Sequence, residues 1–480
     1  MSKLYITTTL PYVNAEPHIG FALEVVQADT IVRYLRSLGN DVFFNTGTDE
    51  HGLKIHRKAQ EAGKETQAYV DEYAEKFKVL KDVLGLVYDV NFIRTTDAHH
   101  KLAAQEFWKR CMDSGDIYKK PYKIKYCVGC ELEKTDSELV DGRCPIHLNI
   151  EIEIIEEENY FFRFSKYQEP LLELYKNNPS FVLPDFRFNE IKSFVKSGLE
   201  DFSITRLKNK MPWGVAVPED PDHVMYVWFD ALVNYISAIG WPMDLERFNQ
   251  YWPVIQLAGK DNLRQQSAMW QAMLMSAGVK PSKQILIHGF IQSDGQKMSK
   301  SLGNVINPID LVKDFGTDAL RYYLLREIPP FDDGDFSMSR FKEVYNADLA
   351  NGLGNLVARV AKLCETTDYN QMGSSEKTNQ HILGDTEYEK AISEYKFNEA
   401  LASVWRKITK VDQYINEEKP WELLKTNQER CKSVLSHCVD QIQEIAILIQ
   451  PFLPETSEKI TEQFKGPKIK SQTPLFPRIN

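Results

Sequence analysis

The run Lys297–Ser301, with the sequence Lys-Met-Ser-Lys-Ser, could do chemistry on a phosphorylated substrate. It follows Asp294-Gly295, a pair typical of tight turns, so a loop is expected there. The ammonium groups of Lys297 and Lys300 sit on flexible stems and can follow phosphate oxygens as charge builds up in a transition state. Taken alone, the run also fits a solvated basic turn. The pattern therefore predicts a mobile basic loop whose role depends on the rest of the chain.

A second candidate for phosphate binding lies near the start of the chain, around His18 and Gly20. Residues 4–9 are apolar and β-branched and predict a strand, while the apolar spacing from Ala22 to Leu35 predicts a helix. His18 and Gly20 therefore fall at the N-terminus of that helix, where free backbone N–H groups and the helix dipole favour phosphate. His18 adds a donor, and Gly20 lets a nucleotide approach the backbone. We expect a nucleotide site at this turn.

Three cysteines and a histidine have the spacing of metal ligands: Cys127, Cys130, Cys144 and His147. Each of the two pairs has two intervening residues, and 13 residues separate the pairs, so two tight turns can close a tetrahedron around one ion. Three thiolates and one imidazole favour zinc over hard cations. Because the protein fills all four positions, the sequence predicts one structural zinc ion. The other cysteines are expected to be buried or inert thiols: Cys111, Cys364, Cys431 and Cys438.

Composition narrows the class of protein. The net charge of −10, from 58 basic and 68 acidic residues, argues against a dedicated, nonspecific nucleic-acid binder but leaves room for local basic patches at 119–125 and 206–210. The sequence has no run of 18 apolar residues and no secretory signal pattern at its start, so no membrane association is expected. We expect a cytoplasmic enzyme, with an organellar mature form as the alternative.

The 480 residues divide into four segments by pattern. Residues 1–115 are expected to form the first half of a parallel α/β sheet, and residues 116–222 an insertion that carries the metal knuckle. Residues 223–340 return to the sheet, with strands expected at 224–229, 255–258 and 285–288 and a helix at 265–277. Residues 341–480 show long amphipathic helices and predict a helical bundle. Gly259-Lys260-Asp261 follows the end of a strand, where open α/β sheets bind ligands.

Together, His18–Phe21 and Lys297–Ser301 resemble the paired signatures of the class I aminoacyl-tRNA synthetases, with Phe21 in the last place of the first signature. The runs Asn45–Gly52, His288–Phe290 and Asp318–Tyr323 are similar to those of the methionyl-tRNA synthetases with a single zinc knuckle. The resemblance implies a Rossmann-type catalytic domain with a knuckle insertion, followed by an α-helical anticodon-binding domain. It also implies a ligase that activates L-methionine with ATP and Mg²⁺ and transfers it to the 3′ end of tRNA(Met), for translation initiation and elongation.

The resemblance also implies roles for single residues. His18, Lys297 and Lys300 correspond to catalytic positions. ATP binding falls on Gly20, Gly259, Lys260, Asp261, Ser299 and Lys300. Methionine binding falls on Leu10, Tyr12, Asp49, Trp228, Ala231, Tyr235, Gln266 and Trp270. A carboxylate at Asp49 suits the α-ammonium group, and aromatic side chains hold a polarisable thioether well. The resemblance assigns recognition of the CAU anticodon to Asn355, Arg359 and Trp421, whose side chains suit hydrogen bonds to base edges and stacking on bases.

The sequence departs from the family at a few positions and leaves rival interpretations open. Gln265-Gln266 stands where bacterial relatives often have Phe-His, and Leu232 stands where many have proline. A sister enzyme for leucine, isoleucine, valine or cysteine is one rival, although about 110 residues between the sheet halves leave little room for an editing insertion. A non-charging tRNA-binding protein, which Phe21 and the two glutamines would suit, is the other. No oligonucleotide-binding domain fits after the bundle, so a monomer is expected.

Overall fold

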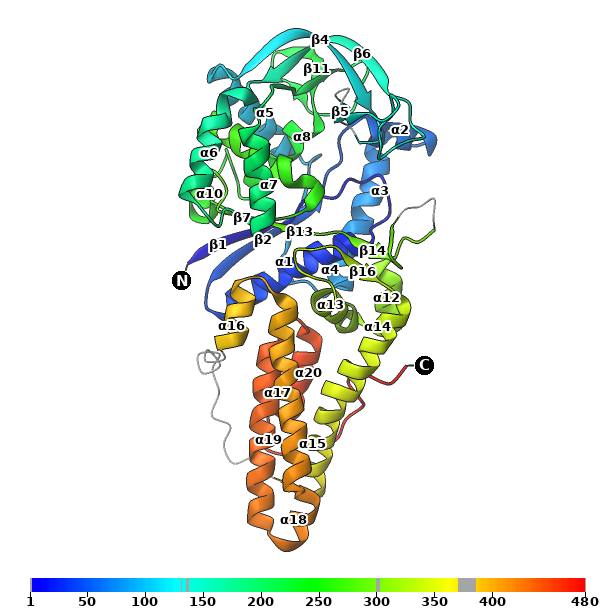
Figure 1. The fold of residues 1–480 in the computed structure, drawn as a ribbon, viewed down its shortest axis with the longest axis vertical. Coiled ribbons are helices and arrows are strands. Elements are labelled where there is room, and N and C mark those ends of the chain that lie inside the picture. The colour runs from blue at the N-terminus through cyan, green and yellow to red at the C-terminus, as the bar shows by residue number, and fades with distance from the viewer. Residues whose placement is uncertain (1, 131, 135–137, 299–302, 370–385, 480) are drawn as a thin grey trace.

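The computed structural model describes residues 2–130, 132–134, 138–298, 303–369 and 386–479. The molecule is elongated, with an α/β part at one end and a helical bundle at the other (Figure 1). Among the described residues, no helix has the length and apolar character needed to cross a membrane.

A six-stranded parallel sheet forms the centre of the α/β part. Its strands, in spatial order, are β3 (Asn91–Arg94), β2 (Asp41–Thr48), β1 (Lys3–Thr7), β12 (Ile255–Gly259), β13 (Gln284–His288) and β7 (Val182–Leu183). Every pairing between them is parallel. The chain order reverses between β1 and β12, and ligands of open α/β sheets bind beside such a switch point. The predicted parallel α/β fold is confirmed.

The two faces of the sheet belong to two separate cores. Along β13, Ile285 and Ile287 pack into one core and Leu286 into the other, as the alternation of a strand requires. Both faces are therefore covered, which explains why these strands are continuous apolar runs in the sequence. The helices of this part are α1 (Ile19–Ser37), α2 (Leu53–Glu61), α3 (Thr66–Lys78), α4 (Leu80–Val83), α5 (Ala98–Asp113), α8 (Val227–Ala231), α9 (Asn234–Ser237), α10 (Leu245–Tyr251) and α11 (Trp270–Ser276).

The strand expected at 224–229 is wrong in its second half. Strand β11 (Asp220–Met225) ends early, and helix α8 begins at Val227. A short apolar run that is buried on all sides carries no periodicity, so the sequence alone cannot distinguish a strand from a helix there. The helix expected at 265–277 is present, but its first turn, Gln265–Met269, is π-helical before α11 begins at Trp270.

The segment between the two halves of the sheet is mostly antiparallel. One sheet contains β5 (Leu132–Lys134), β4 (Ile117–Cys127), β6 (Glu153–Phe162) and β8 (Phe202–Ser203), and another contains β10 (Ala216–Val217), β11 and β9 (Thr205–Leu207). Two helices, α6 (Gln168–Asn177) and α7 (Asp185–Lys196), flank β7, which extends the edge of the parallel sheet. The end of β4 leads directly into the metal knuckle.

A small sheet presents the basic loop. Strands β14 (Ile291–Ser293) and β15 (Gln296–Lys297) form a hairpin, and β16 (Gly334–Phe336) pairs with β14. The hairpin turn at Asp294 and Gly295 has positive φ at both residues, a conformation that this dipeptide adopts readily. The predicted turn therefore forms and carries Lys297 at the start of the loop.

In the C-terminal part, the described residues between 338 and 464 are mostly helical, as the amphipathic pattern predicts. Its helices are α14 (Met338–Val344), a π-helical segment (Tyr345–Gly354), α15 (Asn355–Thr366), α16 (Thr386–Ser393), α17 (Phe397–Glu418), α18 (Pro420–Thr426), α19 (Gln428–Ile449) and α20 (Pro454–Phe464). Helices α12 (Pro308–Phe315) and α13 (Thr317–Arg326) lie between the bundle and the sheet (Figure 1).

Arg321 of α13 fastens the bundle to the α/β part. Its buried guanidinium pairs with Asp29 of α1 at 2.7 Å and donates to the carbonyl of Leu84 at 3.0 Å. It also donates to the carbonyls of Phe452 and Pro451, in the turn between α19 and α20, at 2.7 and 3.1 Å. A buried charge with this many partners holds the neighbouring elements in fixed positions.

Candidate active site

The turn before α1 has the geometry of a phosphate site. His18 is the N-cap of α1, with extended backbone, and its Nδ1 accepts from the Gly20 N–H at 3.1 Å. The Nε2–H of the same ring is therefore left to donate outward. A Cβ on Gly20 would lie 2.9 Å from the His18 ring, so a larger residue there would displace the ring from its capping position. The predicted pair His18 and Gly20 thus lies together at the positive end of a helix.

The basic loop meets this turn. The methyl group of Met298 lies 4.0 Å from the place where a Cβ on Gly20 would be. Lys297, directly before it, is exposed, and its carbonyl accepts from the side chain of Asn304 at 3.2 Å. Segments almost 280 residues apart in the sequence are therefore neighbours in space. The predicted Ser299 and Lys300 lie outside the described residues.

Gly259, Lys260 and Asp261 follow the end of β12, at the switch point of the sheet. A Cβ on Gly259 would lie 2.8 Å from Oδ1 of Asp261, so the glycine allows the Asp261 carboxylate to turn back over the strand end. Burial raises the pKa of Asp261 above its usual value, and its own backbone N–H and the nearby His288 offset only part of that rise. Lys260 points differently: its ammonium group binds Asp333 at 2.6 Å and lies over the ring of Phe290.

The residues expected to hold the α-ammonium group lie at the end of β2. Asp49 forms a parallel bridge with Tyr12, and its N–H donates to the Pro11 carbonyl at 3.0 Å. The loop that carries Leu10 and Tyr12 therefore runs beside the end of β2. The next residue, Glu50, is fully buried and takes two hydrogen bonds from Arg94, at 2.7 and 2.8 Å. This bidentate pair holds the backbone at Asp49 in place.

Helix α8 carries two of the expected methionine contacts, Trp228 and Ala231, and between them the buried Asp230. Asp230 accepts from His51 at 2.6 Å and from His100 at 2.9 Å. Burial on its own would raise the pKa of Asp230, but the two imidazoles hold this pKa well below its usual range. The ionised Asp230 therefore ties α8 to the segment that follows Asp49.

Tyr235 and Trp270 form an aromatic wall, with ring centroids 5.9 Å apart in an edge-to-face arrangement. The Gln266 amide donates to the Tyr235 hydroxyl at 2.7 Å. The indole N–H groups of Trp228 and Trp270 are buried and have no hydrogen-bond partner among the described residues. Unpaired buried donors are costly, so this wall is suited to a bound molecule that brings an acceptor.

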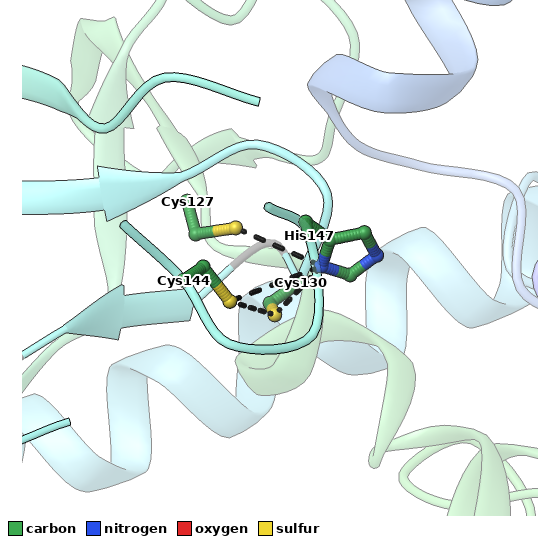
Figure 2. A group of neighbouring side chains, drawn as sticks. All are labelled: Cys127, Cys130, Cys144 and His147. Atoms are coloured by element: carbon green, nitrogen blue, oxygen red, sulfur yellow. Dashed lines mark hydrogen bonds between the residues drawn. The ribbon is translucent and has the colours of Figure 1, made fainter. Parts of the chain in front are cut away.

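The four predicted metal ligands come together at the end of β4 (Figure 2). Their donor atoms all lie within 4.8 Å of one another, with Cys130 Sγ 3.4 Å from Cys144 Sγ and 3.2 Å from His147 Nδ1. In a tetrahedral zinc site, neighbouring sulfurs are about 3.8 Å apart, so the residues fit such an ion. A Cβ on Gly129 would lie 2.5 Å from the His147 ring, so the glycine lets the knuckle close.

The knuckle packs against two of the residues expected to bind methionine, Tyr12 and Trp228. Tyr126 and Val128, on either side of Cys127, form a small apolar cluster with Tyr226 and Val227, and Tyr12 and Trp228 pack against it. The side chain of Lys54 in α2 also donates to the Gly129 carbonyl at 3.2 Å. The knuckle is therefore part of the support for the walls of the site.

At the far end of the bundle, the expected anticodon residues are neighbours. The Arg359 guanidinium lies 5.4 Å from the centroid of the Trp421 ring and pairs with Asp412 at 2.8 Å. The Trp421 side chain, with its residue 41% exposed, remains accessible for stacking. Asn355 is exposed one turn before Arg359 on α15. The three residues together form an exposed polar and aromatic surface.

Sequence reasoning missed the buried residues behind the walls of the site. A lone carboxylate inside an apolar run, as at Asp230, could have been noticed in the sequence. Its partners His51 and His100, however, lie 179 and 130 residues away. The pair Glu24 and His288, 2.8 Å apart and buried, is separated by 264 residues. No local pattern in the sequence connects such residues.

Comparisons with known proteins agree with this geometry. The family model described as tRNA synthetases class I (M) matches residues 4–151 and 147–361, and the model of the anticodon binding domain of methionyl tRNA ligase matches residues 370–474. The methionine–tRNA ligase of Thermotoga maritima is 44% identical over 472 residues, which cover 95% of this chain and 74% of that protein. The corresponding ligase of Nostoc sp. is 42% identical, over 98% of this chain and 92% of that protein.

A solved structure leads to the same family. The Mycobacterium tuberculosis methionyl-tRNA synthetase in complex with methionyl-adenylate has a TM-score of 0.92 and 38% identity, and each chain covers 100% of the other. The resemblance seen in the sequence is therefore confirmed over both the α/β part and the bundle. The chain belongs to the class I methionyl-tRNA synthetases.

Proposed function

We propose that this chain is a methionine–tRNA ligase, which activates L-methionine with ATP and transfers it to tRNA(Met) for initiation and elongation. The observation that carries the proposal is the proximity of Met298 to the His18–Gly20 turn, within a chain that is 44% identical to a methionine–tRNA ligase over 95% of its length. This proximity brings the two proposed phosphate-binding signatures together at the N-terminus of α1.

Adenylate formation needs positioning and positive charge but no covalent enzyme intermediate. The methionine carboxylate attacks the α-phosphorus of ATP, the bond to the β-phosphate oxygen breaks, and pyrophosphate leaves. The outward donor of His18, the N-terminus of α1 and the exposed Lys297 face the developing charge, and Lys300 is the second proposed lysine. Mg²⁺ bound with ATP would neutralise further phosphate charge. Gly259 and Asp261 are proposed to hold the nucleoside, while Lys260 reaches it only by leaving Asp333.

Methionine is proposed to lie between Asp49 and the aromatic wall. Asp49 attracts the α-ammonium group. The side chain is proposed to lie among Leu10, Tyr12, Trp228, Ala231, Tyr235, Gln266 and Trp270. The 3′-terminal ribose of tRNA then attacks the adenylate carbonyl and releases AMP. At the other end of the molecule, Asn355, Arg359 and Trp421 are proposed to read the CAU anticodon, because an exposed indole beside a guanidinium suits unpaired bases.

The knuckle is proposed to hold one structural zinc ion through Cys127, Cys130, Cys144 and His147. The support is chemical and geometric, since three thiolates and an imidazole with tetrahedral separations favour zinc. Cytoplasmic location and a monomeric state are proposed on the activity alone. Size-exclusion chromatography with light scattering would test the monomer.

The decisive experiment is ATP–pyrophosphate exchange with each amino acid in turn. Exchange with methionine alone is expected. Exchange with leucine, isoleucine, valine or cysteine would point to a sister enzyme, and no exchange at all would point to a non-charging tRNA-binding protein.

A variant at the basic loop tests the role of Lys297 in the same assay. Lys297→Ala should reduce exchange about 10²-fold with the methionine KM largely kept, because a charge aimed at the transition state is lost. Lys283→Ala, at the opposite end of β13, is a matched control that should not change exchange. Unchanged exchange in the Lys297 variant would reject this role.

A further inference from the structure

A chain of buried hydrogen bonds leads to the Tyr235 hydroxyl from behind. Its members are Gln266 in the π-helical turn, Gln256 in β12, Gln271 in α11 and Ser282 in the loop before β13. Their exposed fractions are 1%, 0%, 0% and 5% respectively, so every polar atom among them depends on the others for partners. None of the last three has a role in the chemistry described so far.

At the Ser282 end of this network, the direction of donation is fixed. The backbone N–H of Ser282 donates to Gln271 Oε1 at 2.9 Å, and a backbone N–H can only donate. Gln271 must therefore turn its amide nitrogen the other way. That nitrogen donates to Ser282 Oγ at 3.1 Å and to the Gln266 carbonyl at 2.8 Å.

The direction passes along the remaining links. The Ser282 hydroxyl also carries one proton, which it donates to Gln256 Oε1 at 2.5 Å. The Gln256 amide nitrogen then donates to Gln266 Oε1 at 3.1 Å. The Gln266 amide nitrogen, in turn, donates to the Tyr235 hydroxyl oxygen at 2.7 Å. Each side-chain amide has one orientation that satisfies both of its neighbours.

The last link determines what Tyr235 can offer to a ligand. Its oxygen is occupied by the Gln266 donor, and burial raises the pKa of Tyr235, so the hydroxyl keeps its proton. The hydroxyl therefore has its proton left to donate, although the side chains of Asn234 and Gln256 also lie close to it. A thioether sulfur is a weak acceptor, whereas a methylene group of the same shape accepts nothing.

We propose that Gln256, Gln271 and Ser282 are positioning residues that hold the Tyr235 hydroxyl as a hydrogen-bond donor and so favour a thioether side chain over a hydrocarbon one. The inference rests on the proposed methionine–tRNA ligase activity and deepens it. An amide at position 266 suits this role, because it can present a donor to Tyr235 at any pH.

The sharpest test is to reverse the direction of these hydrogen bonds. In Gln256→Glu, the ionised carboxylate can only accept, so Gln266 must turn its amide nitrogen toward residue 256 and its oxygen toward Tyr235. The Tyr235 proton then goes to Gln266 instead of the substrate. In ATP–pyrophosphate exchange, kcat/KM should fall about tenfold for L-methionine through KM and change less than about twofold for L-norleucine.

Two further variants separate this effect from damage to the fold. Gln256→Met removes the donor without adding charge, and Ser282→Ala removes one link, so each should lower the preference for methionine over norleucine by about threefold. Gln463→Glu places the same carboxylate at another buried glutamine, whose amide donates to the Lys470 carbonyl, and should leave the preference unchanged.

The ratio between the two substrates decides the outcome. Equal losses for methionine and norleucine, or an unchanged preference in all three variants at 256 and 282, would overturn the positioning role. A wild-type chain that exchanges pyrophosphate with some other amino acid would instead overturn the proposed function, so the two failures are distinguishable.

Discussion

Asp230 is a single buried carboxylate that joins three segments far apart in the sequence. It lies in α8, between two residues proposed to contact methionine, and binds His51 after β2 and His100 in α5. The other nitrogen of His100 meets Ser237 Oγ at 3.0 Å, so the network continues into α9. The position of helix α8 therefore depends on this buried residue.

Asp230→Asn should weaken this support. One of the two imidazoles would face an amide N–H instead of an oxygen, and the loss should lower the free energy of unfolding by about 2 kcal/mol and raise the methionine KM several-fold. Denaturant unfolding and exchange kinetics measure both effects. Asp222→Asn, at an exposed position on β11, is the matched control. An unchanged KM would show that α8 is held by its apolar packing alone.

The dependence of the free energy of unfolding on acidic pH should also change in this variant. Because the folded pKa of Asp230 is depressed, its contribution is fully present above its unfolded pKa of about 3.9 and is lost as pH falls toward the folded value. The stability of the Asn variant should therefore fall less steeply than that of the wild type below about pH 4.

Among elements, the strands and helices with strong local patterns could be predicted and the contacts between them could not. The strand at β13 and the Asp294-Gly295 turn follow from residue types alone. The spacing of the metal ligands likewise identified the knuckle. By contrast, the start of α8 is hidden in an apolar run, and the partners of Gln256 depend on how β12, α11 and β13 pack together. Such contacts are set by tertiary structure.

The metal knuckle is the element most open to a direct test. Purified protein should contain about one zinc ion per chain, and Cys144→Ser should lose most of it, because three ligands leave the tetrahedron incomplete. Metal analysis measures this, and limited proteolysis should then cut near residues 126–147 while the bundle stays protected. Cys364→Ala removes a buried thiol of α15 and should retain the metal. Full zinc content in the Cys144 variant would contradict the proposed ligand set.

Across the whole molecule, the two ends should respond independently to substitution. Trp421→Ala should lower the kcat/KM for charging of tRNA(Met) by about 10–100-fold, the range expected when one stacked base is lost, and leave exchange within about twofold. Aminoacylation and exchange assays on the same preparation make the comparison. Tyr88→Ala removes an aromatic side chain that is 85% exposed outside the bundle and serves as the control. Equal losses in both assays would refute an anticodon role for Trp421.

The buried guanidinium of Arg321 makes the span between the two ends a constant of the protein. Helix α1 and the turn that joins α19 to α20 share this one side chain, so swinging the bundle would separate the guanidinium either from Leu84 and Asp29 or from the buried carbonyls of Pro451 and Phe452. The distance between the α/β part and the far end of the bundle is therefore expected to stay constant. A bound tRNA is therefore expected to adapt its own shape to this distance.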